Sequence, residues 1–308
     1  MPEIAIILPT GYGQLKALGE AARHAEAKGF SAVYSPEGNN DSLANMLNAA
    51  LATTRIGLGT AITNIYFRHP ILAAASAAHI YEVSNGRFTL GLGTSHRLMN
   101  DTRGIQIVHP LKTMRDYVTA VRKNLPAGHP VPIHISALRK GMSRLAGEVA
   151  DGVIFNMVPV SKLPEAIAAV REGQAKRADK KRVKITTFLG ACVDKDVNAA
   201  RETARSMIAF YLRLEYYRNV MTEYGYGEMA ERAGKIFADG DEKGMAKAVP
   251  DSIIDELTLY GPRERCLEHL QRYYKSGIEL SIISARHPSG DFTKGFESAL
   301  EGLAPAVR

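Results

Sequence analysis

Short apolar runs alternate with segments of helical periodicity along almost the whole chain. Continuous apolar runs are typical of strands covered on both faces, and apolar residues three or four positions apart are typical of helices packed on a sheet. Apolar stripes such as Leu111, Met114 and Val118 predict the helices. The pattern predicts eight strands, at residues 4–8, 32–35, 55–62, 88–93, 131–137, 152–157, 183–193 and 279–285.

Eight successive strand and helix units favour a closed (β/α)8 TIM barrel over an open sheet. The GxGxxG motif of dinucleotide-binding sheets does not follow the first strand. A length of 308 residues suits one barrel. We therefore predict a single domain over residues 1–308, in which residues 213–260 form an insertion between the seventh and eighth strands.

Composition excludes several classes of function. The formal net charge is +7, but the densest basic run, residues 171–182, contains acidic residues and no aromatic ones, so we expect no nucleic-acid partner. No apolar stretch is long enough to cross a bilayer and the N-terminus does not look like a signal peptide, so we expect a cytoplasmic protein. Cys192 and Cys266 lie in apolar segments and are expected to be free thiols. No metal-binding spacing of His or Cys occurs, so no metal site is expected.

Active sites of such barrels lie in the loops after the strands. Glu37 follows the second predicted strand and His96 the fourth, so a carboxylate and an imidazole could converge there as proton donor and acceptor. Alternatively, Glu37 binds a backbone amide and His96 a loop carbonyl. Asp41 precedes a helical run and is predicted to cap it.

The fifth predicted strand runs into a helix through a short basic loop. Amides at a helix N-terminus attract phosphate, so this loop is a candidate anion site, although it could equally be an ordinary connection. Its residues are Ser136, Ala137, Leu138, Arg139, Lys140, Gly141 and Met142.

Several long segments together carry a family resemblance. They are AARHAEAKGFSAVYSPE, TTRIGLGTAITNIYFRHPILAAASAAHIYEVSNGRFTLGLGTSHR, VPIHISALRKGMSRLAGEVADGVIFN and LTLYGPRERCLEHLQRYYKSGIE. The chain resembles the luciferase-like flavin-dependent oxidoreductases, particularly the branch that uses the deazaflavin F420. The resemblance implies a (β/α)8 barrel with a late insertion, a homodimer, and hydride transfer between C5 of F420 and a small organic substrate.

The resemblance also implies which residues hold the cofactor. In F420-using members, the third strand ends in a bulge with a non-prolyl cis peptide against the deazaflavin ring, which corresponds here to Thr60, Ala61 and Ile62, with Asn64 as a polar contact. The loop at 136–142 matches the family's phosphate loop, and Asn156 is a further expected contact. The F420-type sugar-phosphate dehydrogenase has His after strand two and Glu after strand four. In this chain the two residue types are exchanged, with Glu37 after strand two and His96 after strand four. The resemblance therefore does not extend to the substrate of that dehydrogenase.

Three alternatives stay open on the sequence. The chain could be an FMN-dependent monooxygenase of the same family, a flavin-binding protein without catalysis, or a barrel that binds sugar phosphates without flavin. The segment GTAITN and the basic charge favour F420. Tyr12, Tyr66, Phe67 and the insertion are expected either to shape the substrate pocket or to belong to the core.

Overall fold

The computed structural model describes residues 3–10, 15–241 and 244–305. Eight parallel strands form a closed barrel, because β8 pairs with both β7 and β10 and the order returns through β1. The barrel strands are β1 (Glu3–Ile7), β2 (Ala32–Ser35), β3 (Gly57–Thr60), β5 (Phe88–Gly93), β6 (Ile133–Ala137), β7 (Gly152–Asn156), β8 (Lys184–Val193) and β10 (Leu280–Ala285). The predicted TIM barrel is confirmed.

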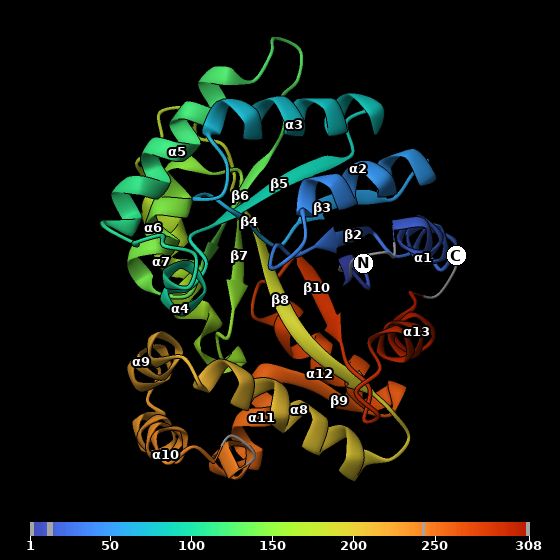
Figure 1. Ribbon diagram of the computed structural model, residues 1–308, viewed down its shortest axis with the longest axis vertical. Helices are drawn as coiled ribbons and strands as arrows, with labels where there is room; N and C mark the ends of the chain where they lie inside the picture. Colours follow the sequence, from blue (N-terminus) through green and yellow to red (C-terminus); the bar gives the residue numbers. More distant parts are fainter. Residues whose placement is uncertain (1–2, 11–14, 242–243, 306–308) are drawn as a thin grey trace.

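Helices surround the strands on the outside of the barrel (Figure 1). They are α1 (Leu15–Ala27), α2 (Ser42–Ala52), α3 (Pro70–Val83), α4 (Arg97–Asp101), α5 (Pro110–Asn124), α6 (Lys140–Val149), α7 (Leu163–Ala175), α8 (Val197–Leu212), α9 (Glu215–Glu223), α10 (Gly227–Ala238), α11 (Asp251–Leu257), α12 (Arg263–Lys275) and α13 (Phe292–Leu303), with short 3-10 turns at η1 (Val160–Lys162) and η2 (Gly244–Ala248). Asp41 accepts hydrogen bonds from the amides of Leu43 and Ala44, at 2.9 and 3.1 Å, so the predicted cap of α2 is confirmed.

The third strand is shorter than the predicted run of residues 55–62. It ends at Thr60, the Ala61–Ile62 peptide bond is cis, and the two-residue strand β4 (Thr63–Asn64) then pairs with β5. The Ala61 amide donates to the carbonyl of Ser35, and the Ile62 carbonyl accepts from the Glu37 amide. The chain therefore leaves the sheet as a bulge that is hydrogen-bonded to the end of β2.

The start of the bulge also depends on a close approach of β3 to β5. The Thr60 hydroxyl donates to the Gly91 carbonyl at 2.8 Å and accepts from the Gly91 amide at 2.9 Å. A Cβ atom at Gly91 would lie 1.8 Å from the Thr60 carbonyl oxygen, so only glycine fits there. Thr60 is fully buried by this contact.

The segment between β8 and β10 builds a second layer on one side of the barrel (Figure 1). Within the predicted insertion, α9, α10 and α11 pack with α8 around a hydrophobic cluster separate from the main core. The strand β9 (Thr258–Gly261) pairs with the second half of β8, beyond the residues of β8 that pair with β7. The sequence predicted neither β9 nor α10; the segment that contains α10, residues 224–244, is rich in glycine and charge.

The two cysteines are buried and free, as predicted, with Cys192 in the cluster under the insertion and Cys266 in the main core. Burial raises the pKa of the Cys192 thiol to about 11, so it stays protonated near neutral pH. Within the described ranges, no helix is both long and apolar enough to cross a membrane.

Candidate active site

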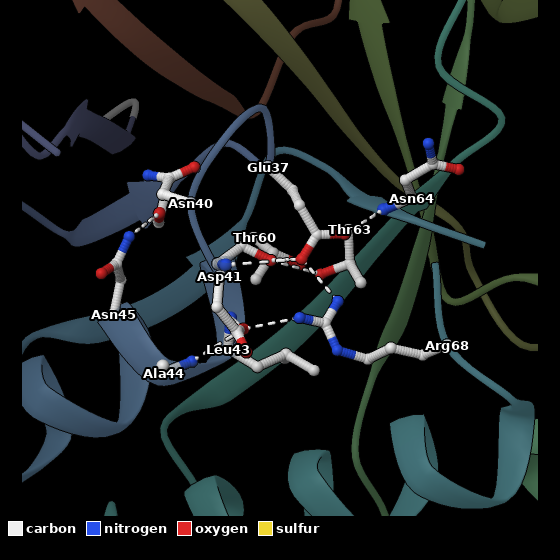
Figure 2. Close-up of polar contacts among 12 residues, drawn as sticks. Glu37, Asn40, Asp41, Leu43, Ala44, Asn45, Thr60, Thr63, Asn64 and Arg68 are labelled. Carbon is white, nitrogen blue, oxygen red and sulfur yellow. Dashed lines mark hydrogen bonds and ion pairs between the residues drawn. The ribbon is translucent and has the colours of Figure 1, made fainter. Parts of the chain in front are cut away.

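Glu37 lies after β2 with its carboxylate almost completely buried, at 2% side-chain exposure. Its Oε1 accepts from the Ser42 amide and hydroxyl and forms an ion pair with Arg68, and its Oε2 accepts from the Asn64 amide at 2.8 Å (Figure 2). Arg68 also pairs with Asp41. Both oxygens of Glu37 are therefore engaged, Oε2 with the bulge and Oε1 with Arg68 and the start of α2.

Asn64 connects this cluster to the loop after β5. Its side-chain nitrogen donates to Asn100 Oδ1 at 2.9 Å, and its Oδ1 accepts from the Tyr66 amide. Asn100 lies in α4 and donates in turn to the carbonyl of Thr94. The side chain of Asn64, predicted to contact the cofactor, is fully buried and holds two loops together.

His96 is the residue at the start of α4. Its Nδ1 accepts from the Met99 amide at 3.4 Å, whereas no hydrogen bond to its Nε2 is found among the residues that the structure describes. Burial, together with the positive charge of Arg103, lowers the pKa of His96 below its ordinary value. The imidazole is therefore neutral near pH 7, and Nε2 is the ring nitrogen left for another partner. No contact joins His96 directly to Glu37 in the described part of the chain.

The bulge and the start of the predicted phosphate loop meet at Gly93, the last residue of β5. A Cβ atom there would lie 2.6 Å from Ile62 Cγ1 and 2.7 Å from Ser136 Oγ. Ile62 and Ser136 are both partly exposed. The absence of a side chain at Gly93 therefore lets the two halves of the expected cofactor site adjoin each other.

The loop after β6 leads into α6, whose first residue is Lys140. Arg139 is the residue before α6, and its side chain makes no hydrogen bond to the first backbone amides of the helix. Arg139 pairs with Glu223 of α9, and Lys140 pairs with Glu165 at 2.6 Å. Gly141 is exposed and Met142 packs against the main core. The loop thus offers helix-end amides next to two cations that already have acidic partners.

The insertion reaches this loop directly. The Tyr224 hydroxyl donates to the carbonyl of Leu138 at 2.7 Å, and Arg139 lies over the ring of Tyr216. The buried residue Ala137 ends β6 just before this contact. The second layer of the molecule therefore helps to fix the candidate phosphate loop.

Asn156, at the end of β7, lines a cavity of about 450 Å³ between the barrel and α8. The cavity extends past Phe188 of β8 and Tyr211 of α8 to Arg286, which follows β10. Phe188 packs on the same inner cluster as Ile62 of the bulge. Phe188 therefore links the cavity to the cluster on which the bulge packs, and the volume of the cavity is that of a small-molecule site.

Tyr211 and Arg286 were missed by the sequence analysis, which followed the loops only as far as the sixth strand. Arg286 comes directly after the eighth predicted strand, so the same rule extended by two strands would have found it. Tyr211 lies within a helix and has no comparable signal. Tyr66 packs on the main core, Phe67 lies beside Arg103 at the surface hollow near Glu37, and Tyr12 lies outside the described residues. No group of side chains suited to a metal ion occurs in the described ranges.

Comparison with known proteins identifies related chains. The model of the family described as luciferase-like monooxygenase matches residues 4–280. A 5,10-methylenetetrahydromethanopterin reductase from Archaeoglobus fulgidus is 31% identical, over 92% of this chain and 93% of the relative. These matches agree with the expected family and with an oxidoreductase function.

Solved structures share the fold. The coenzyme F420-dependent tetrahydromethanopterin reductase from Methanopyrus kandleri superposes with a TM-score of 0.77 at 22% identity, covering 98% of both chains. A monooxygenase from Streptomyces bottropensis superposes with a TM-score of 0.68 at 16% identity, again covering 98% of both chains. At these identities the two structures establish the barrel architecture.

Proposed function

Since this chain belongs to the luciferase-like monooxygenase family, we propose that it is an oxidoreductase that transfers a hydride between F420 and a small organic substrate. The name of the Archaeoglobus relative supports F420 chemistry, because that relative is a methylenetetrahydromethanopterin reductase and the structural neighbour of the same type is F420-dependent. It also makes a methylene-bearing reduced pterin the first substrate to test.

The observation that carries the proposal is the meeting of the bulge and the phosphate loop at Gly93. A ring on the bulge of residues 60–64 would lie next to Ile62, and the loop of residues 136–142 would bind the phosphate with its helix-end amides. Asn156, at the end of the neighbouring strand β7, borders the cavity. The residues present therefore fit a flat cofactor with a phosphate tail.

When bound, F420 supplies or accepts the hydride at C5. The chain contributes position and proton transfer. His96 exchanges the proton that accompanies the hydride, because Nε2 has no partner and the lowered pKa keeps the ring neutral near pH 7. Glu37 supports the reaction by holding the bulge to the start of α2, since Oε2 accepts from the Asn64 amide and Oε1 accepts from the Ser42 hydroxyl. In the direction of reduction, His96 would take up a proton from solvent and, as the imidazolium, would give a proton from Nε2 to the substrate.

The proposal is tested by titrating the purified protein in parallel with F420 and FMN and following cofactor fluorescence. Tight binding of F420 and weak binding of FMN are expected. Turnover is then measured as the appearance of oxidised F420 when reduced F420 and methylenetetrahydromethanopterin are mixed with the protein. Failure of both cofactors to bind would overturn the proposal and leave only the fold.

A second candidate function is an FMN-dependent monooxygenase. The description of the matching family and the monooxygenase among the structural neighbours favour it. Preferential binding of FMN in the same titration, with oxygen uptake in the presence of reduced FMN, would replace the first proposal with this one.

We also propose a cytoplasmic homodimer. Neighbouring helices α2 and α3 expose five apolar side chains. These are Leu47, Leu51, Ile71, Leu72 and Val83. Such a group on adjacent helices is typical of an interface, whereas single exposed apolar residues are ordinary. Light scattering should give twice the 33.5 kDa mass for the native protein and the single mass for Leu51→Glu. A monomeric native protein would contradict the proposal.

A further inference from the structure

Arg286 is the first residue after β10 and lines the cavity between the barrel and α8. Its guanidinium is partly buried, and its Nη1 donates to the Ser284 hydroxyl at 3.2 Å and to the Ala285 carbonyl at 2.8 Å. Among the residues that the structure describes, Nε and Nη2 make no hydrogen bond and no carboxylate forms an ion pair with Arg286. The Asp194 carboxylate lies next to the following residue instead, with its Oδ2 3.8 Å from His287 Nε2.

The remaining contacts of Arg286 fix its orientation without neutralising it. Its Cζ atom lies 4.6 Å from the centre of the Phe292 ring. Tyr211 lies across the cavity on α8, and the side-chain nitrogen of Asn156, which also lines the cavity, donates to the Tyr217 hydroxyl at 3.5 Å. The cavity is otherwise walled mainly by apolar side chains, among them Phe188 and Phe210. A cation in such surroundings is stabilised by an anionic ligand, and a planar guanidinium with free donors suits a carboxylate or phosphate.

We propose that Arg286 binds an anionic group of the substrate, carboxylate or phosphate, while the apolar wall of the cavity holds an uncharged body. This inference rests on the proposed oxidoreductase function, because it takes the cavity between the barrel and α8 as the substrate pocket. The substrate class is therefore an organic molecule with one apolar or aromatic portion and an anionic end. The anionic end lies at β10 and the reacting portion lies toward Phe188, which packs with Ile62 of the bulge on one cluster.

The experiment uses a pair of probes that differ in charge and hardly in shape, 2-naphthoate and 2-naphthamide. Both are titrated calorimetrically into the full chain loaded with F420. We expect the native protein to bind the anion at least about tenfold more tightly, because hydrogen bonds to a charged group are the stronger ones. Arg286→Gln should remove the preference, and Arg286→Lys should retain part of it.

A matched control is Arg182→Gln, which changes the net charge of the protein by the same amount. Arg182 is exposed, pairs with Glu279 and lies far from the cavity. This control should keep the preference for naphthoate. Circular dichroism establishes that each variant is folded. An unchanged preference in folded Arg286→Gln, or no preference in the native protein, would overturn the inference.

The anion could also belong to the cofactor, so a second arm distinguishes the two sources. Naphthoate should bind equally well with and without F420. Competition between naphthoate and F420 would assign Arg286 to the cofactor and overturn the inference about the substrate. Binding of F420 itself, followed by fluorescence in native protein and Arg286→Gln, tests the proposed function separately. If F420 binds while the charge preference is absent, only the substrate inference fails.

Discussion

The two sides of the barrel mouth differ in how far their polar side chains are hydrogen-bonded within the protein. After β2 and β4, the Glu37 carboxylate accepts from the Asn64 amide (Figure 2). The side chain of Asn64 donates to Asn100, which donates in turn to the Thr94 carbonyl. After β10, Arg286 keeps unused donors beside a cavity. The contrast indicates that the first side fixes the backbone on which a cofactor would rest, whereas the second offers groups to a ligand.

His96 is the exception on the saturated side, and its removal should have the largest effect on activity. Because Nε2 has no partner, we expect His96→Ala to lower turnover by about 100-fold or more. F420 affinity, measured by fluorescence, should stay within a few fold of the native value. In the direction of substrate oxidation, in which neutral His96 accepts the proton, the lowered pKa predicts that activity persists below pH 6.5 and declines only at lower pH, and a pH profile of turnover in that direction checks this. Native turnover in His96→Ala would remove His96 from the mechanism.

Breaking the saturated cluster should mainly reduce stability. Glu37→Ala leaves the partly buried Arg68 with Asp41 as its remaining partner and removes the acceptor of the Asn64 amide. We expect a loss of about 3 kcal/mol in the free energy of unfolding, measured in urea. Glu37→Gln keeps the shape and the acceptor oxygen and should lose less. A stable Glu37→Ala variant with abolished turnover would instead make Glu37 a participant in proton transfer.

His134 tests whether an unpartnered buried polar group always marks a ligand site. It lies near the start of β6, away from the mouth, and its Nδ1 has no hydrogen-bond partner within the described ranges. Complete burial, and to a smaller extent Lys184, lowers its pKa to about 4.

Below its ordinary pKa of about 6.5, the unfolded chain binds a proton at His134 that the folded chain does not bind, so stability falls as pH falls from 6.5 towards 4. Between pH 7 and 5 this amounts to about 2 kcal/mol. Between pH 7 and pH 5, the free energy of unfolding in urea should fall by that amount more in the native protein than in His134→Leu. If native protein and His134→Leu showed the same pH dependence of stability, the attribution of this effect to His134 would be wrong.

The smallest effect is expected at the ion pair between Arg139 and Glu223. Both side chains are about half exposed, at 44% and 46%, so Glu223→Ala should cost less than about 1 kcal/mol of stability. The same change frees Arg139 beside the phosphate loop, and F420 affinity should stay equal or rise. A large loss of stability would mean that the insertion depends on this contact, and Glu231→Ala, in an exposed pair within α10, is the matched control.

The sequence by itself determined the barrel. Its eight apolar runs match the eight barrel strands, because a strand buried on both faces must be apolar whatever its neighbours are. The cap at Asp41, the free cysteines and the positions of Glu37 and His96 after their strands also follow from local pattern.

Only the tertiary structure decided what those residues do. Whether a carboxylate after a strand is free or saturated depends on partners such as Arg68 and Asn64, which are about 30 residues away in sequence. The gap at Gly93 and the uncompensated charge of Arg286 likewise arise from side chains that the fold brings together or keeps apart. Local periodicity carries no information about such contacts, because each depends on the packing of several strands at once.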